Sequence, residues 1–186
     1  MLQQVYPQPL IGDAPLYHDA LRWVGVALSS FGIVYNRDVL RDVLDIHEPT
    51  QWRDLSDPVY AGWLALADPA HSGSITATYH AILSRQGCSA GWKTLRRIFA
   101  NACYFAWSAS KVPVDVSAGQ AAAGMCINFY GRFQSGAIGG DRVGYVDPPL
   151  TTVITADPIS ILRGAPHREL ANAFVLWLLS SQAQHL

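Results

Sequence analysis

Short apolar runs alternate along the chain with segments whose apolar residues recur at helical spacing. The short runs are rich in β-branched and aromatic residues, which is typical of buried strands. These predicted strands cover residues 23–28, 31–35, 63–67, 103–107, 124–129, 142–146 and 151–155. Because strands and helices alternate, the pattern predicts an α/β fold with a largely parallel sheet that helices cover on both sides.

The clearest helix signals lie in residues 72–87. Ser72 is a typical N-cap and Gly87 a typical terminator, and the apolar residues between them share one face. A second helix is predicted over residues 90–101, with inward-facing Trp92, Leu95, Ile98 and Phe99. Further helices are predicted over residues 36–46 and 111–118, from Tyr130 onward, and around Leu170, Phe174, Trp177 and Leu178.

The composition is that of a folded domain. Hydrophobic residues make up 50% of the 186 residues and charged residues 15%, unlike a disordered chain. Lys and Arg number 13 against 14 Asp and Glu, and the largest basic cluster is the pair Arg96 and Arg97, so no nucleic-acid partner is predicted. No apolar run reaches the roughly 18–20 residues of a membrane span, so none is predicted.

The usual catalytic and cofactor motifs do not occur in this sequence. His47 and Glu48 are not followed by the second histidine of HExxH, residues 136–144 do not form GxGxxG, and residues 91–94 lack the loop glycine of a P-loop. The six histidines and three cysteines show no metal-ligand spacing, and a Ser/His/Asp triad has no support. The sequence therefore predicts no enzyme activity, no resident metal and no cofactor.

Polar residues follow several of the predicted strands. They supply the candidate ligand-binding residues, which are Ser72, Gly73, Ser74, Ser110, Asn128 and Tyr130. The first three open a predicted helix, where unpaired N–H groups and the helix dipole favour an anion. Each of the six candidate residues also has a simpler interpretation, as a helix cap or a packing residue. Tryptophans 52, 63, 92, 107 and 177 are interpreted as core or interlobe packing residues. Since ligands of open α/β sheets bind at the carboxyl ends of strands, three such ends favour a cleft.

Two groups of segments give the chain a family resemblance. The first group is WVG (23–25), FGI (31–33), YN (35–36), PTQWRDL (49–55), ALADP (65–69) and SGS (72–74). The second group is GQAAAG (119–124), TADPI (155–159) and ANAFVLWLLSSQAQ (171–184). In this order and spacing, over about residues 23–184, they resemble the extracellular solute-binding proteins of bacterial ABC importers, of the iron(III), phosphonate and spermidine type.

The resemblance implies an α/β, periplasmic-binding-protein-like (type 2) fold with two hinged lobes. Because the family's secretion signal and first N-terminal portion are not recognised, we expect a truncated chain or a fragment, with a complete second lobe and a partial first lobe. The expected organisation is an irregular entry (1–22), hinge-crossing strands (23–36), the second lobe (37–128), and its remainder with the return crossing and the last helix of the first lobe (129–186). Residues 23–28 and 124–128 are expected to lie together as links between the lobes.

The resemblance also implies a function. A small solute, which is an oxyanion, a phosphonate or an iron(III)-type ligand, would be captured in a cleft between the lobes and delivered to an ABC permease in the membrane, without catalysis. The place of action would be periplasmic or extracellular. The alternative is a cytosolic α/β ligand-sensing domain or an enzyme of unknown reaction.

Two details qualify these implications. Iron-binding family members hold the metal with paired tyrosines, and here that position reads Asn128, Phe129 and Tyr130. Tyr130 is therefore the only candidate metal ligand, and an oxyanion at residues 72–74 is at least as well supported. An incomplete first lobe would also leave the apolar face of the last helix uncovered, which predicts a homo-oligomer.

Overall fold

The computed structural model describes residues 10–11, 14–138, 140–149 and 154–185. The chain divides into two compact units. Unit 1 consists of Met1–Ser29 and Ile154–Leu186, and unit 2 of Ser30–Val153. Strand β3 (Val24–Asn36) contributes its first half to unit 1 and its second half to unit 2.

Unit 2 is built on a mixed sheet with strand order β5-β4-β6-β3-β7. Besides β3, its strands are β4 (Leu64–Ala67), β5 (Ala102–Ala106), β6 (Ala123–Ile127) and β7 (Val143–Val146). Strand β4 runs parallel to β5 and β6, whereas β3 runs antiparallel to β6 and β7. The prediction of a largely parallel sheet therefore holds for only part of it.

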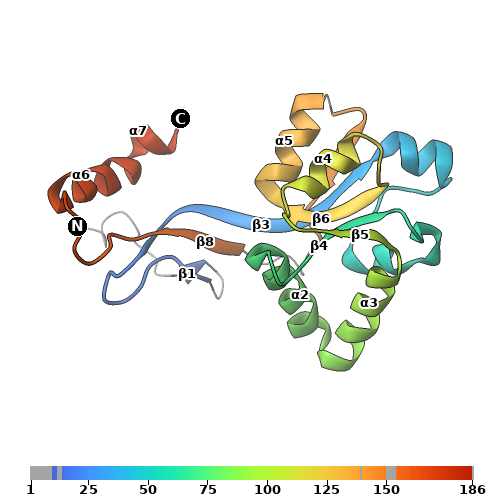
Figure 1. Cartoon of the computed structure of the whole chain (residues 1–186), viewed down its shortest axis with the longest axis horizontal. Coiled ribbons are helices and arrows are strands. Elements are labelled where there is room, and N and C mark those ends of the chain that lie inside the picture. The colour runs from blue at the N-terminus through green and yellow to red at the C-terminus, as the bar shows by residue number, and fades with distance from the viewer. Residues whose placement is uncertain (1–9, 12–13, 139, 150–153, 186) are drawn as a thin grey trace. The chain divides into compact units, whose positions relative to one another are not determined.

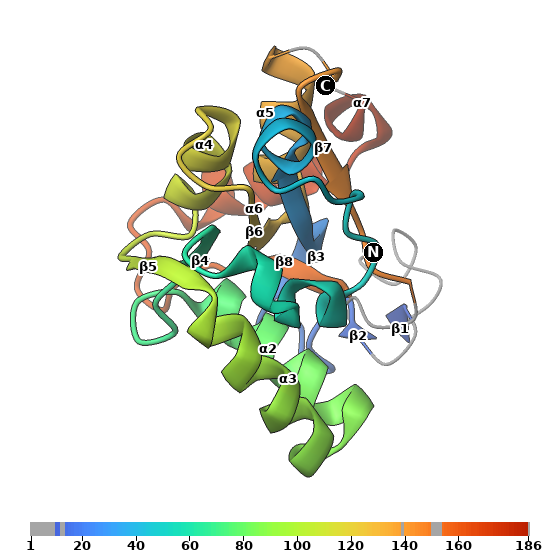
Figure 2. The same ribbon diagram turned by 90° about the vertical axis from the view of Figure 1, so that its right-hand side faces the viewer.

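Helices cover both faces of this sheet. Figure 1 shows α4 and α5 over one face and α2 and α3 over the other, and Figure 2 shows the same layers from the side. These helices are α2 (Gly73–Gln86), α3 (Cys88–Ala100), α4 (Lys111–Ser117) and α5 (Asn128–Ile138). Shorter helical segments precede β4: the π-helical η1 (Val39–Val43) and the 3-10 helices η2 (Trp52–Ser56) and η3 (Pro58–Tyr60).

Helix α2 has the ends that the sequence predicts. Ser72 is its N-cap, with the Oγ accepting from the Ile75 N–H at 3.3 Å. Gly87 ends it with a φ of 78°, a conformation that favours glycine. In α3, Leu95 and Ile98 are buried as predicted, but Trp92 is 48% exposed, so the prediction that it faces inward is wrong.

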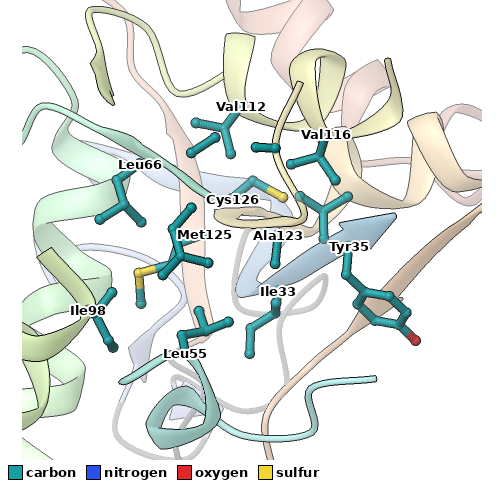
Figure 3. Close-up of a cluster of buried hydrophobic side chains, with 14 of the residues drawn as sticks. Ile33, Tyr35, Leu55, Leu66, Ile98, Val112, Val116, Ala123, Met125 and Cys126 are labelled. Atoms are coloured by element: carbon teal, nitrogen blue, oxygen red, sulfur yellow. The ribbon is translucent and has the colours of Figure 1, made fainter. Parts of the chain in front are cut away.

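The core of unit 2 lies between the sheet and its helices. Figure 3 shows Ile33, Leu66 and Met125 from neighbouring strands in one cluster with Leu55 of η2 and Ile98 of α3. Gly124 permits close packing on the other face, because a Cβ there would collide with the Val112 side chain of α4 and with the Ala65 carbonyl.

Unit 1 contains a small ribbon, a strand pair and two helices. Its elements are β1 (Leu10–Ile11), β2 (Ala14–Pro15), the first half of β3, β8 (Ile154–Ile159), α6 (Arg168–Leu178) and α7 (Ser181–Gln184). Strand β8 pairs with β3. The Ser29 Oγ donates to Asp157 Oδ2 at 2.5 Å, and the Gln184 side chain donates to the Val26 carbonyl at 3.1 Å. Residues 151–153 of the predicted strand 151–155 lie outside the described residues.

Two predictions about the strands are corrected. Residues 23–28 and 31–35 form the single strand β3, because Ser29 and Ser30, which look like a break, bond through their hydroxyls to Asp157 and Asp147. The expected link at residues 124–128 is wrong as well. Strand β6 lies wholly in unit 2, where it pairs with the second half of β3.

Candidate functional site

The candidate ligand-binding residues all lie at one edge of the sheet of unit 2. Strands β5, β4 and β6 are neighbours and parallel, so their carboxyl ends meet at this edge. Residues 72–74 follow β4 in the middle, Ser110 follows β5 on one side, and Asn128 and Tyr130 follow β6 on the other. This is the edge at which open α/β sheets bind ligands.

The turn at residues 72–74 offers several free hydrogen-bond groups. The hydroxyls of Ser72 and Ser74 lie 3.1 Å apart, and Ser72 is 8% exposed. Within the described residues, nothing accepts a hydrogen bond from the backbone N–H of Gly73 or Ser74. A Cβ on Gly73 would meet nothing within 4 Å, so the turn is open on this side. Ser72 is thus a helix cap, and the N–H groups beside it are available to an anion.

A fixed loop leads into this turn. The Asp68 N–H donates to the Ala106 carbonyl at 2.8 Å, which joins the ends of β4 and β5. Asp68 Oδ1 accepts from the Ala70 N–H at 2.8 Å, and Oδ2 lies 3.0 Å from His71 Nδ1. The Ala70 N–H, and then His71, hold the pKa of the Asp68 carboxyl below its ordinary value. The carboxylate therefore stays charged and orients the His71 ring.

An aromatic pair borders the loop. The rings of His71 and Trp107 are stacked, with centroids 3.4 Å apart and planes inclined by 25°. Trp107 is 73% exposed, so its interpretation as a packing residue is wrong. The sequence signal for this pair is only that Trp107 ends a predicted strand, directly before Ser108.

Ser110 lies where predicted but does not cap α4. Its hydroxyl is 2.8 Å from that of Ser108, and no side-chain capping bond forms. Farther along the helix, Asp115 is buried and accepts hydrogen bonds from Lys111 and from Tyr104. Burial raises the pKa of Asp115, but these two hydrogen bonds outweigh it and leave the pKa below its ordinary value. The Lys111 charge is thus neutralised locally.

Asn128 and Tyr130 lie in the first turn of α5. The helix begins at Asn128, two residues earlier than predicted. The Asn128 Oδ1 is buried and has no hydrogen-bond partner among the described residues. A buried acceptor without a donor costs about 1–3 kcal/mol, so this oxygen calls for a donor from a solvent molecule or a ligand. The ring of Tyr130 lies 4.2 Å from that of Phe129, and both side chains are exposed.

A cavity of about 750 Å³ lies elsewhere in unit 2, lined by residues that precede β4 and β5. It contains none of the candidate residues. The carboxylate of Glu48 in this cavity already accepts two hydrogen bonds, from the Tyr35 hydroxyl at 2.5 Å and from Arg37 Nε at 2.6 Å. The hydrogen bond from Tyr35 is the largest cause that lowers the pKa of Glu48.

Two further features bear on function. In the part of the chain that the structure describes, no helix is both long enough and apolar enough to cross a membrane. The same residues contain no group of three His, Cys, Asp or Glu side chains placed to hold a metal ion.

Known proteins resemble this chain over most of its length. The family model described as bacterial extracellular solute-binding protein matches residues 3–186. The phosphoglycerate transport regulatory protein PgtC of Salmonella typhimurium is 27% identical over 163 residues, which are 88% of this chain and 40% of PgtC. The Fe(3+)-binding periplasmic protein of Serratia marcescens is 28% identical over 174 residues, which are 89% of this chain and 48% of that protein.

Solved structures share the fold. The periplasmic binding protein AfuA of Actinobacillus pleuropneumoniae, solved with fructose-6-phosphate bound, superposes with a TM-score of 0.81 and 22% identity over 95% of this chain and 55% of AfuA. Iron-bound HitA of Pseudomonas aeruginosa superposes with a TM-score of 0.71 and 20% identity over 91% of this chain and 55% of HitA. The predicted periplasmic-binding-protein-like α/β fold is thereby confirmed. This chain spans about half the length of these relatives, and it belongs to the family of bacterial extracellular solute-binding proteins.

Proposed function

We propose that this chain is the substrate-binding component of an ABC-type importer and that it binds a small oxyanion, or a solute that carries one, at residues 72–74. Family membership favours a binding role, outside the cytoplasm and without catalysis, over the enzyme and cytosolic sensor alternatives. The membrane permease of such an importer is the partner that this role requires. In this proposal, unit 2 is the second lobe and unit 1 part of the first.

The observation that carries the proposal is the pair of N–H groups at Gly73 and Ser74, which lie beside two hydroxyls and have no acceptor in the described part of the chain. They lie at the amino end of α2, where the helix dipole is positive. Hydrogen bonds to an ionised acceptor are about twice as strong as neutral ones, so an anion can be held without a basic side chain. Ser110 and Tyr130 at the neighbouring strand ends complete the proposed site, and Asn128 Oδ1 accepts from a solute hydroxyl.

Iron(III) is the less favoured solute. Iron(III) is a hard cation, and among the candidate ligand-binding residues Tyr130 is the one phenol, beside hydroxyl and amide groups that are neutral. The phenol of Tyr79 also lies at the end of β4, but it is buried and donates to the Ala67 carbonyl. The carboxylate of Asp68 is already engaged by Ala70 and His71. The names of similar proteins include both phosphoglycerate transport and Fe(3+) binding, and the donor set of this chain supports the oxyanion.

Isothermal titration calorimetry with inorganic phosphate and with phosphate esters tests the site. We expect Ser74→Ala to weaken binding by about 1–3 kcal/mol, because a desolvated hydrogen bond to the anion is lost. Ser84→Ala is the matched control: Ser84 is exposed on the same helix, far from its amino end, and its loss leaves affinity unchanged. Equal affinity of Ser74→Ala and the wild type, or tighter binding of iron(III) than of every oxyanion, contradicts the proposal.

A further inference from the structure

Trp107 is the most exposed aromatic side chain among the described residues, at 73%. Its exposed indole keeps a large apolar surface in contact with water, which costs free energy in the empty protein. An exposed side chain that simply follows a strand is expected to be mobile. Trp107 is held instead, because His71 stacks against one side of its ring at 3.4 Å.

The stack is itself supported by the loop before α2. His71 Nδ1 lies 3.0 Å from Asp68 Oδ2, and the Asp68 N–H donates to the carbonyl of Ala106, the residue next to Trp107. The Thr76 hydroxyl donates to the Pro69 carbonyl at 2.9 Å, which ties the same loop to α2. The indole is therefore positioned before any solute arrives, and such preorganisation lowers the entropy cost of binding.

The stack adjoins the proposed anion site directly. His71 immediately precedes Ser72, so the stack is joined through the backbone to Gly73 and Ser74, whose N–H groups have no acceptor among the described residues. One face of the indole is occupied by His71. At 73% exposure, the rest of the ring is accessible to a solute whose anionic group lies at the helix terminus.

We infer that the solute is a phosphate ester with a ring, whose flat face packs on Trp107 while its phosphate binds at residues 72–74. The inference rests on the proposed function and adds the class of solute and its second contact. A sugar ring and an aromatic ring both offer a face of this kind. A phosphate ester without a ring gains nothing from Trp107.

Calorimetry with matched esters tests the inference on the 186-residue chain. The probes are inorganic phosphate, glycerol 3-phosphate as the ester without a ring, fructose 6-phosphate as the sugar ester and phenyl phosphate as the aromatic ester. We expect at least one ring ester to bind about tenfold more tightly than glycerol 3-phosphate, which is the order of effect that stacking on an aromatic side chain gives. The ester that gains identifies the kind of ring.

Variants separate the ring contact from the anion contact. We expect Trp107→Ala to abolish the preference for the ring ester and to leave the affinities for phosphate and glycerol 3-phosphate within twofold, and Trp107→Phe to retain most of the preference. Trp92→Ala is the matched control, since Trp92 is also exposed but lies on α3. Because Trp107 is exposed, its removal leaves the core intact, which the melting temperature checks.

The failures are distinguishable. If phosphate and all esters bind equally, or if Trp107→Ala weakens all of them alike, the ring contact is refuted and the anion site stands. If neither phosphate nor any ester binds to the wild type, the proposed function and this inference both fall.

Discussion

At the scale of single residues, buried polar groups in unit 2 are joined in pairs that bridge distant parts of the chain. Asn36 is buried, its Nδ2 donates to the Val116 carbonyl at 2.9 Å, and its Oδ1 accepts from the Val39 N–H at 3.1 Å. The same side chain therefore bonds the first residue of η1 and fastens it to the end of α4. Among the side-chain atoms that the structure describes, the buried Asn128 Oδ1 is the exception, because it has no hydrogen-bond donor. Its position in the proposed site is consistent with a polar group kept for a solute.

The pair Tyr35–Glu48 makes stability depend on pH at the alkaline end. Burial, and then the hydrogen bond to Glu48, raise the pKa of Tyr35 to about 12. The unfolded chain releases this proton near pH 10, so the stabilising contribution is complete below about pH 10 and is lost as the pH rises toward 12. Urea unfolding at a series of pH values measures the effect. We expect the free energy of unfolding to fall less steeply over this range in Tyr35→Phe, which cannot titrate.

Other tyrosines with raised pKa values remain in both proteins, so only the difference between the two slopes reports on Tyr35. They are Tyr60, Tyr79, Tyr104 and Tyr145. Parallel curves for wild type and Tyr35→Phe would show that Tyr35 titrates alike in the folded and unfolded chains.

At the scale of elements, the space around each glycine shows where two elements pack closely and where the surface is open. A Cβ on Gly124 of β6 would collide with Val112 and the Ala65 carbonyl, whereas a Cβ on Gly136 of α5 would meet nothing. We expect Gly124→Ala to lower the free energy of unfolding by about 1–3 kcal/mol through overpacking. Gly136→Ala is the control and raises it by about 0.5–1 kcal/mol, because alanine favours a helix interior. Urea denaturation measures both, and stabilisation by Gly124→Ala would contradict this packing.

The elements that could be predicted from sequence are those with local signals. Helix α2 is one, since Ser72 and Gly87 mark its ends within the segment itself. Strand β3 looks broken because the carboxylates that satisfy Ser29 and Ser30 lie more than a hundred residues away along the chain. The pairing of β6 with β3 is equally non-local, so residues 124–128 could not be recognised as an inner strand.

The residues of the candidate site also divide into those with a local sequence signal and those without one. Residues 72–74 carry their own signal, because a hydroxyl-rich turn opens a helix directly after a strand. Trp107 carries only its place at the end of a strand, which does not indicate exposure. It follows β5, which lies at the end of the strand order, so nothing in the sequence shows that its ring stays uncovered.

At the scale of the whole molecule, unit 1 leaves an apolar helix face uncovered. None of the residues of α6 is buried, and Phe174 and Trp177 are 53% and 45% exposed. Exposed apolar surface of this kind favours association. The predicted homo-oligomer therefore has a candidate surface, which consists of Leu170, Phe174 and Trp177.

Analytical ultracentrifugation over a range of concentrations tests this surface. We expect the wild type to self-associate and Phe174→Asp to remain monomeric at the same concentrations, because a charge on the apolar face opposes its burial. Asn172→Asp is the matched control, since it adds the same charge at an exposed position of the same helix and keeps the association. A wild-type monomer at high concentration would refute the prediction.

The stacked and exposed ring of Trp107 also gives the protein an intrinsic optical signal. Indole emission shifts to shorter wavelength when water leaves the ring, and the other five tryptophans contribute a background that the spectrum of Trp107→Ala measures. Binding of a solute that covers Trp107 would therefore shift the emission of the protein to shorter wavelength, without any added dye. Screening of solute collections by fluorescence can thus begin with the unmodified chain, at concentrations well below those that calorimetry needs.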